Sequence, residues 1–156
     1  MKKYNMKIRH LLCLFAALSL LTTMFIWGNS LKSIPESSAQ SSAVADKIQG
    51  VVDPQQKVEP SIFHNLIRKL AHVIEFFILG LFVGGFAICL GYELDKRLIS
   101  LPMLIVLLIA VGDEWIQVYA GRGSLVTDVL IDFSGALAGL LMTAIVHQVI
   151  LKFKTK

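Results

Sequence analysis

Residues 70–90 read LAHVIEFFILGLFVGGFAICL. His72 and Glu75 are the only residues of this stretch drawn from His, Asp, Glu, Lys and Arg, and both lie near its start. A helix of roughly 20 apolar residues crosses the hydrocarbon core of a bilayer, which is about 30 Å thick. The stretch therefore predicts a membrane-spanning helix that carries two polar side chains close to one end.

Three more windows have the same character, at residues 10–27, 98–119 and 125–150. Of the 156 residues, 55% are hydrophobic and 17% are charged, and the mean hydropathy of +0.68 is too high for an ordinary soluble domain. We predict an all-α membrane protein with four transmembrane helices. One long outer loop joins the first two helices, and short connections make the last three antiparallel neighbours.

The first window could alternatively be a cleaved signal peptide, because basic residues precede it. Its apolar run at residues 11–27 is longer than the core of a typical signal peptide, and the small residues at 37–43 lie too far downstream for a cleavage site. We therefore expect a retained first helix.

The basic residues set the expected orientation, because short cytoplasmic segments beside helix ends are enriched in Lys and Arg. With both termini cytoplasmic, the inner side holds nine basic residues: Lys2, Lys3, Lys7, Arg9, Lys96, Arg97, Lys152, Lys154 and Lys156. We expect a multi-pass protein of the cytoplasmic membrane with both termini inside. The net charge of +4 reflects these anchors, and we expect no nucleic-acid partner.

We divide the chain into residues 1–28 with the first helix, an outer loop at 29–67, a three-helix core at 68–150 and a basic tail at 151–156. Within the loop, Val44, Ile48 and Val51 recur at near-helical spacing. Both a short amphipathic helix on the membrane surface and an irregular loop fit this pattern. The apolar residues at 62–67 predict an interfacial turn that leads into Arg68 and Lys69.

Ten polar residues gather at the outer ends of the last three helices. Ionisable groups at membrane depth cost free energy and usually face a protein interior or a wet cavity. Helical spacing lets Lys69, His72 and Glu75 of the second helix share one face. The residues are Arg68, Lys69, His72, Glu75, Asp113, Glu114, Gln117, Arg122, Asp128 and Asp132.

Asp128 and Asp132 share a stripe of the last helix with Gly135 and Gly139. Glycines four apart let a neighbouring helix approach closely in lipid, so we expect the two carboxylates to point into the bundle. Asp113 and Glu114 point about 100° apart, so we expect one of them to face the cluster while the other snorkels or pairs with Arg122. The predicted ligand-binding residues are Lys69, His72, Glu75, Asp113, Glu114, Gln117, Arg122, Asp128 and Asp132.

Several of these residues also carry a resemblance. The pieces are RKLAHVIEF at 68–76 with Gly80, DEWIQ at 113–117, Gly121 with Arg122, and the aspartates and glycines of the last helix, with a weaker echo in SSAQS at 37–41. In this order and spacing they resemble the VanZ-like family of small bacterial integral membrane proteins. The chain departs from the family pattern at Ala120, where a proline is common, and at Asp132, where an amide is common.

The resemblance implies a protein of the bacterial cell envelope. The family is named for a protein associated with resistance to the glycopeptide antibiotic teicoplanin, and no reaction is attached to its motif. Antibiotic resistance is therefore one expected role, and the oligomeric state stays open.

Two functional hypotheses use the whole cluster. In the first, Arg68, Lys69 and Arg122 bind an envelope lipid, a cell-wall precursor or a glycopeptide antibiotic, since guanidinium groups bind phosphate bidentately. In the second, the protein is an intramembrane enzyme acting on a phosphorylated or acylated lipid of the outer leaflet, with His72 or Glu75 as general acid or base. Asp128 would orient that base, and Arg122 with Lys69 would stabilise developing negative charge. Ser124 is the only candidate nucleophile.

Two further hypotheses need no organic ligand. Polar residues can form an ion-pair network that only fixes helix register. His72 and Glu75 could also bind a metal with carboxylates of other helices, but such sites usually repeat the motif and this chain has one copy. We therefore expect no metal and no cofactor.

Overall fold

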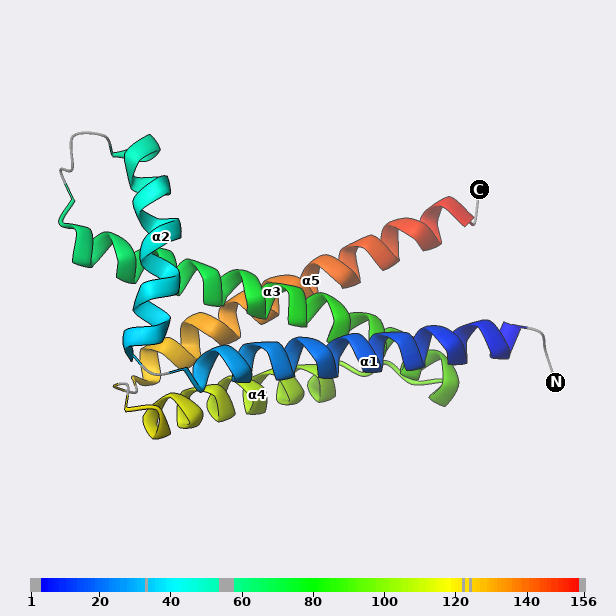
Figure 1. Ribbon diagram of the computed structural model, residues 1–156. Helices are drawn as coiled ribbons and strands as arrows, with labels where there is room; N and C mark the ends of the chain where they lie inside the picture. The colour runs from blue at the N-terminus through cyan, green and yellow to red at the C-terminus, as the bar shows by residue number, and fades with distance from the viewer. Residues whose placement is uncertain (1–3, 33, 54–57, 122, 124, 155–156) are drawn as a thin grey trace.

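The structure is a computed structural model and describes residues 4–32, 34–53, 58–121, 123 and 125–154. These residues form helices and connections and contain no strand (Figure 1). The five helices are α1 Tyr4–Ser30, α2 Ile34–Val52, α3 Pro60–Leu94, α4 Ser100–Tyr119 and α5 Val126–Lys154.

Four of the helices are long and apolar enough to cross a membrane, which confirms the predicted number of spans. They are α1, α3, α4 and α5, whose candidate spans cover Met6–Ser30, Pro60–Leu94, Ser100–Tyr119 and Val126–Lys154. With 35 residues at about 1.5 Å per residue, α3 is about 52 Å long and exceeds the hydrocarbon thickness of about 30 Å. The N-terminal turns of α3 project beyond the other spanning helices (Figure 1).

The interfacial turn predicted at residues 62–67 is wrong, because α3 runs without interruption from Pro60. Proline fits the first turn of a helix, where its missing N–H needs no partner. No glycine or second proline separates Pro60 from Arg68, so the helix continues into the membrane span.

The predicted outer loop contains α2, which settles the choice between a helix and an irregular loop in favour of the helix. In Figure 1, α2 stands across the end of the bundle opposite the two termini. Two contacts tie this region together: Gln49 Nε2 donates to the carbonyl oxygen of Val58 at 3.0 Å, and His64 Nε2 lies 2.9 Å from Asp46 Oδ1. Val44, Val51 and other apolar side chains of α2 remain exposed.

Helix α3 is the centre of the bundle, because it packs against each of the other four helices. The buried core lies around its middle, and the outward faces of the spanning helices expose large apolar side chains, as expected for surfaces in contact with lipid. The core residues are Ile26, Phe76, Leu79, Val83, Val106, Ala110 and Ala136.

Helices α3 and α5 approach so closely that glycine is required at their contact. A Cβ atom at Gly80 would overlap the backbone carbonyl of Ala136, and one at Gly139 would overlap that of Phe77. A Cβ at Gly135 would lie 2.6 Å from the carbonyl oxygen of Val73. The glycine stripe of α5 is therefore the contact face that its spacing predicted, and this face carries the polar residues of α5 into the bundle.

Candidate functional site

The polar cluster lies a short distance below one end of the bundle. Asp113 precedes the end of α4 by six residues, and Asp132 follows the start of α5 by six residues, so each lies about 9 Å inside its helix. His72 of α3 faces both of them. Three helices thus deliver polar side chains to the same depth, at the end of the bundle away from the termini (Figure 1).

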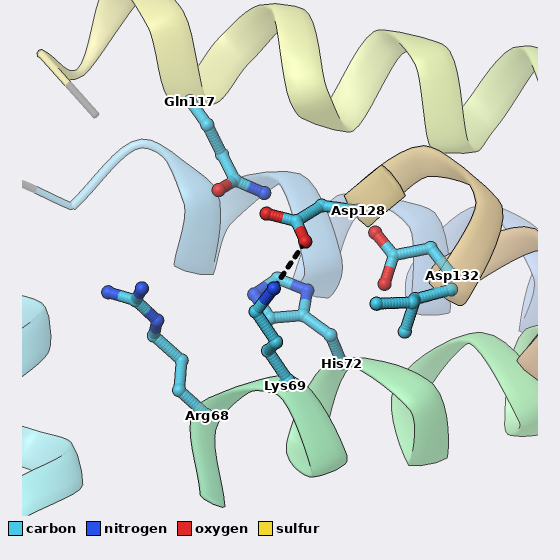
Figure 2. Close-up of a pocket in the computed structure, with 7 residues that line it drawn as sticks. Arg68, Lys69, His72, Gln117, Asp128 and Asp132 are labelled. Atoms are coloured by element: carbon cyan, nitrogen blue, oxygen red, sulfur yellow. Dashed lines mark hydrogen bonds and ion pairs between the residues drawn. The ribbon is translucent and has the colours of Figure 1, made fainter. Parts of the chain in front are cut away.

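A pocket opens at this level and has an empty volume of about 340 Å³, counted to its open mouth. Figure 2 shows how its polar side chains converge from α3, α4 and α5. Five of the nine predicted ligand-binding residues line it, together with Arg68 and one apolar residue. The lining residues are Arg68, Lys69, His72, Gln117, Asp128, Ile131 and Asp132.

The two cations of the pocket have different partners. Lys69 Nζ donates to Asp128 Oδ1 at 2.6 Å, an ion pair that joins α3 to α5, and the two side chains are 42% and 27% exposed. Arg68 forms no hydrogen bond or ion pair with any residue in the described part of the chain, and its side chain extends beside the pocket (Figure 2). One cation is therefore largely neutralised, while the other is available to an anion.

Asp113 is fully buried behind the pocket lining. Its Oδ2 accepts a hydrogen bond of 2.9 Å from Gln117 Nε2, one helical turn further along α4, and lies 3.8 Å from His72 Nδ1. Gln117 thus fixes the carboxylate at the position where it faces the imidazole.

Asp132 is 3% exposed and makes no hydrogen bond or ion pair among the described residues. Figure 2 shows its carboxylate turned toward the side of the pocket where His72 lies. One ligand atom from each of His72, Asp113 and Asp132 can be chosen so that all three lie within 4.8 Å of one another. Among the predicted residues, this trio is the set whose atoms could hold a metal ion.

Glu114 is 3% exposed, so the prediction that one of the two adjacent acids snorkels is wrong. Its Oε1 accepts a hydrogen bond of 2.9 Å from the backbone N–H of Leu125, just before α5 begins. Asp113 accepts from Gln117 on its own helix, whereas Glu114 holds the connection between α4 and α5. The alternative pairing with Arg122 lies outside the described residues.

Glu75 faces α1 instead of lining the pocket. Its Oε1 accepts a hydrogen bond of 3.3 Å from Asn29 Nδ2, and Asn29 Oδ1 accepts one of 3.0 Å from Lys32 Nζ. Sequence reasoning did not place Asn29 or Lys32 in the cluster. One sequence feature could have indicated this contact. Asn29 lies beside Trp27 at the end of the first span, and that end is at the same depth as the cluster.

For the enzyme hypothesis, Asp113 is a further candidate for the orienting carboxylate. Asp128 binds Lys69, whereas Asp113 Oδ2 is the carboxylate oxygen found 3.8 Å from His72 Nδ1. The candidate nucleophile Ser124 and the predicted charge stabiliser Arg122 lie outside the described residues.

Four spanning helices around a buried polar cluster define a multi-pass α-helical membrane protein with a polar site between its helices. The chain belongs to the VanZ/LLP1 family, whose family model matches residues 11–147. This match includes most of α1, all of α2 and the whole polar cluster, so it extends well beyond the motifs that carried the resemblance. Searches among curated proteins and among solved structures gave no match.

Proposed function

We propose that the protein binds the anionic, phosphate-bearing headgroup of a membrane lipid or lipid-linked cell-wall precursor in this pocket. The observation that carries the proposal is Arg68, which lines the pocket without an ion-pair partner among the described residues. A guanidinium group presents donors in a rigid fork that matches two oxygens of a phosphate.

Lys69 supplies a second contact to the same anion. Its ammonium has three donors and is only partly used by Asp128, and its side chain is 42% exposed. Lys69 can therefore keep its ion pair with Asp128 while it donates to a phosphate held by Arg68.

The size of the pocket favours a headgroup over a whole antibiotic. Most of its empty volume is open mouth, and the space that it encloses is only about 30 Å³, which suits a small polar group. A glycopeptide antibiotic is too large to enter and could touch only the rim. The helices that carry the pocket expose leucines toward the surrounding lipid, including Leu70 and Leu130, so acyl chains can extend along them.

The pocket is proposed to face the outer leaflet. Basic residues gather at the other end of the bundle, where Arg9 of α1 lies 3.5 Å from Glu93 near the end of α3 and where the tail carries Lys152 and Lys154. The positive-inside rule favours a cytoplasmic position for that end. The proposed ligand is then a lipid of the outer leaflet.

Binding can be measured by native mass spectrometry of the detergent-solubilised protein with phosphatidylglycerol, a polyprenyl phosphate or phosphatidylcholine. We expect both anionic lipids to bind more tightly than phosphatidylcholine. Arg68→Gln should weaken anionic binding by about 10–100-fold, because hydrogen bonds to charged groups contribute about 1.5–3 kcal/mol. Arg9→Gln makes the same chemical change at the opposite end of the bundle and should leave the affinity unchanged.

A preference for one anionic lipid would identify the source of the phosphate, and equal affinities would assign the site to the phosphate group itself. Equal binding of phosphatidylcholine, or an Arg68→Gln variant that binds like the wild type, would contradict the proposal. Teicoplanin serves as a further ligand: we expect any binding of it to be insensitive to Arg68→Gln, since it cannot enter the pocket.

A further inference from the structure

We infer that His72, Asp113 and Asp132 form a binding site for a divalent metal ion at the inner end of the pocket. The three residues come from α3, α4 and α5, and one ligand atom from each lies within 4.8 Å of the other two. The inference does not depend on headgroup binding, because it uses these three residues and neither Arg68 nor Lys69.

The spacing is close to that of bound ligands. Nitrogen and carboxylate oxygen ligands lie about 2.0–2.2 Å from a zinc ion, so two ligands of a tetrahedral site are about 3.3–3.6 Å apart. His72 Nδ1 and Asp113 Oδ2, at 3.8 Å, are within about half an ångström of this spacing. A pair at the full 4.8 Å needs to close by roughly 1.2–1.5 Å, which a side-chain rotation can provide.

Asp132 gives the strongest independent support. It is 3% exposed, faces the pocket and has no hydrogen-bond or ion-pair partner within the described ranges. A buried carboxylate in a membrane protein normally pairs with a cation or coordinates a metal. Lys69 is bound to Asp128 at 2.6 Å, so a metal ion is the cation that fits beside Asp132.

The donor set indicates the class of metal. One imidazole and two carboxylates suit Zn²⁺, and Mn²⁺ as a harder alternative. Two carboxylates neutralise the charge of a divalent ion, so the loaded site adds no net charge to an apolar bundle. Gln117, which donates to Asp113 Oδ2 at 2.9 Å, is the outer partner that orients a ligand carboxylate in such sites.

The site also has an entry path. His72 and Asp132 line the pocket, which is open to the surface, while Asp113 closes the inner side. Three protein ligands leave one tetrahedral position open, and that position faces the pocket. Sequence reasoning expected no metal because the His/Glu motif occurs once, but the structure brings carboxylates of two further helices to His72 and directs Glu75 toward Asn29.

The test uses Zn²⁺ alone and the full-length protein in detergent, stripped with a chelator and free of anionic lipid. Isothermal titration and metal analysis after dialysis should give one tightly bound zinc per chain. Asp132→Asn should weaken zinc binding by more than about 100-fold, and the positioning variant Gln117→Ala by about 10–100-fold. Asp95→Asn makes the same chemical change at the C-terminal end of α3, away from the pocket, and should bind zinc like the wild type.

X-ray absorption of the zinc-loaded wild type tests the inference even if a ligand variant fails to fold. We expect a coordination shell of nitrogen and oxygen only. A sulfur ligand would assign the metal to Cys13 or Cys89, which are free, and would overturn the inference. A wild type that retains no zinc, or an Asp132→Asn variant that binds zinc as tightly as the wild type, would overturn it too. Lipid binding measured in chelator reports on the headgroup proposal separately.

Discussion

Replacing Asp132 by asparagine is expected to make the metal-free protein more stable. Asp132 is 3% exposed and has no hydrogen-bond or ion-pair partner in the part of the chain that the structure describes. An aspartate at the centre of a membrane helix costs about 2.5–3.5 kcal/mol. Asparagine keeps the shape of the side chain and removes the charge, so the variant avoids much of this cost.

The magnitude follows from the depth of the residue. Asp132 lies about 9 Å inside the start of α5 and lines an open pocket, so its cost is smaller than at mid-membrane. We expect the free energy of unfolding to rise by about 1–2 kcal/mol, within the roughly 1–4 kcal/mol found when buried ionic groups are replaced. For a chain of 156 residues, this raises Tm by roughly 2–8 °C.

Thermal unfolding in detergent with a chelator, followed by tryptophan fluorescence, measures the effect. Asp128→Asn is the matched control: it makes the same chemical change on α5 but breaks the half-exposed pair with Lys69, so we expect a loss of about 0–1 kcal/mol. Zn²⁺ should reverse the order of wild type and Asp132→Asn, because only the wild type gains binding energy. A clear loss of stability in Asp132→Asn without metal would refute the reasoning and assign the carboxylate to a structural network.

Three other predictions concern packing and orientation. Gly139→Ala should lower the free energy of unfolding by about 1–3 kcal/mol, because the added Cβ meets the backbone of Phe77. Gly28→Ala is the control: it has open space around it and should be neutral or stabilising. Denaturant titration compares the two variants, and equal effects would contradict the close contact. In the same titration, Glu114→Ala should cost about 1.5–3 kcal/mol, because it removes the hydrogen bond that the buried Glu114 carboxylate accepts from the N–H of Leu125. An unchanged midpoint would contradict this role. A fluorescent protein fused to the C-terminus should be active and a fused alkaline phosphatase inactive; the reverse pattern would place the pocket on the cytoplasmic side.

The number of spanning helices could be predicted from the sequence because it depends only on local length and hydropathy. The inward direction of Asp132 was also predictable. Gly135 and Gly139 mark the contact face of α5, and helical periodicity places Asp132 on the same face. These features need no knowledge of which helices are neighbours.

The residue at which α3 begins and the burial of the Glu114 side chain could not be predicted from local patterns. Apolar residues at 62–67 fit both a turn at the interface and a helical extension, and the distinction depends on the helix that Pro60 begins. Glu114 is buried because the backbone N–H of Leu125 returns to it, and that contact depends on the path of the connection between α4 and α5. The Asn29–Glu75 contact likewise requires the packing of α1 against α3, which no local pattern specifies.

The most direct test of the proposed headgroup site is a crystal structure of the protein from crystals grown in a lipid mesophase doped with phosphatidylglycerol. We expect phosphate density within hydrogen-bond distance of the Arg68 guanidinium, in the pocket that also holds the Lys69–Asp128 ion pair. A pocket closed by rearranged side chains, with Arg68 turned into solvent and no headgroup density, would contradict the proposed function.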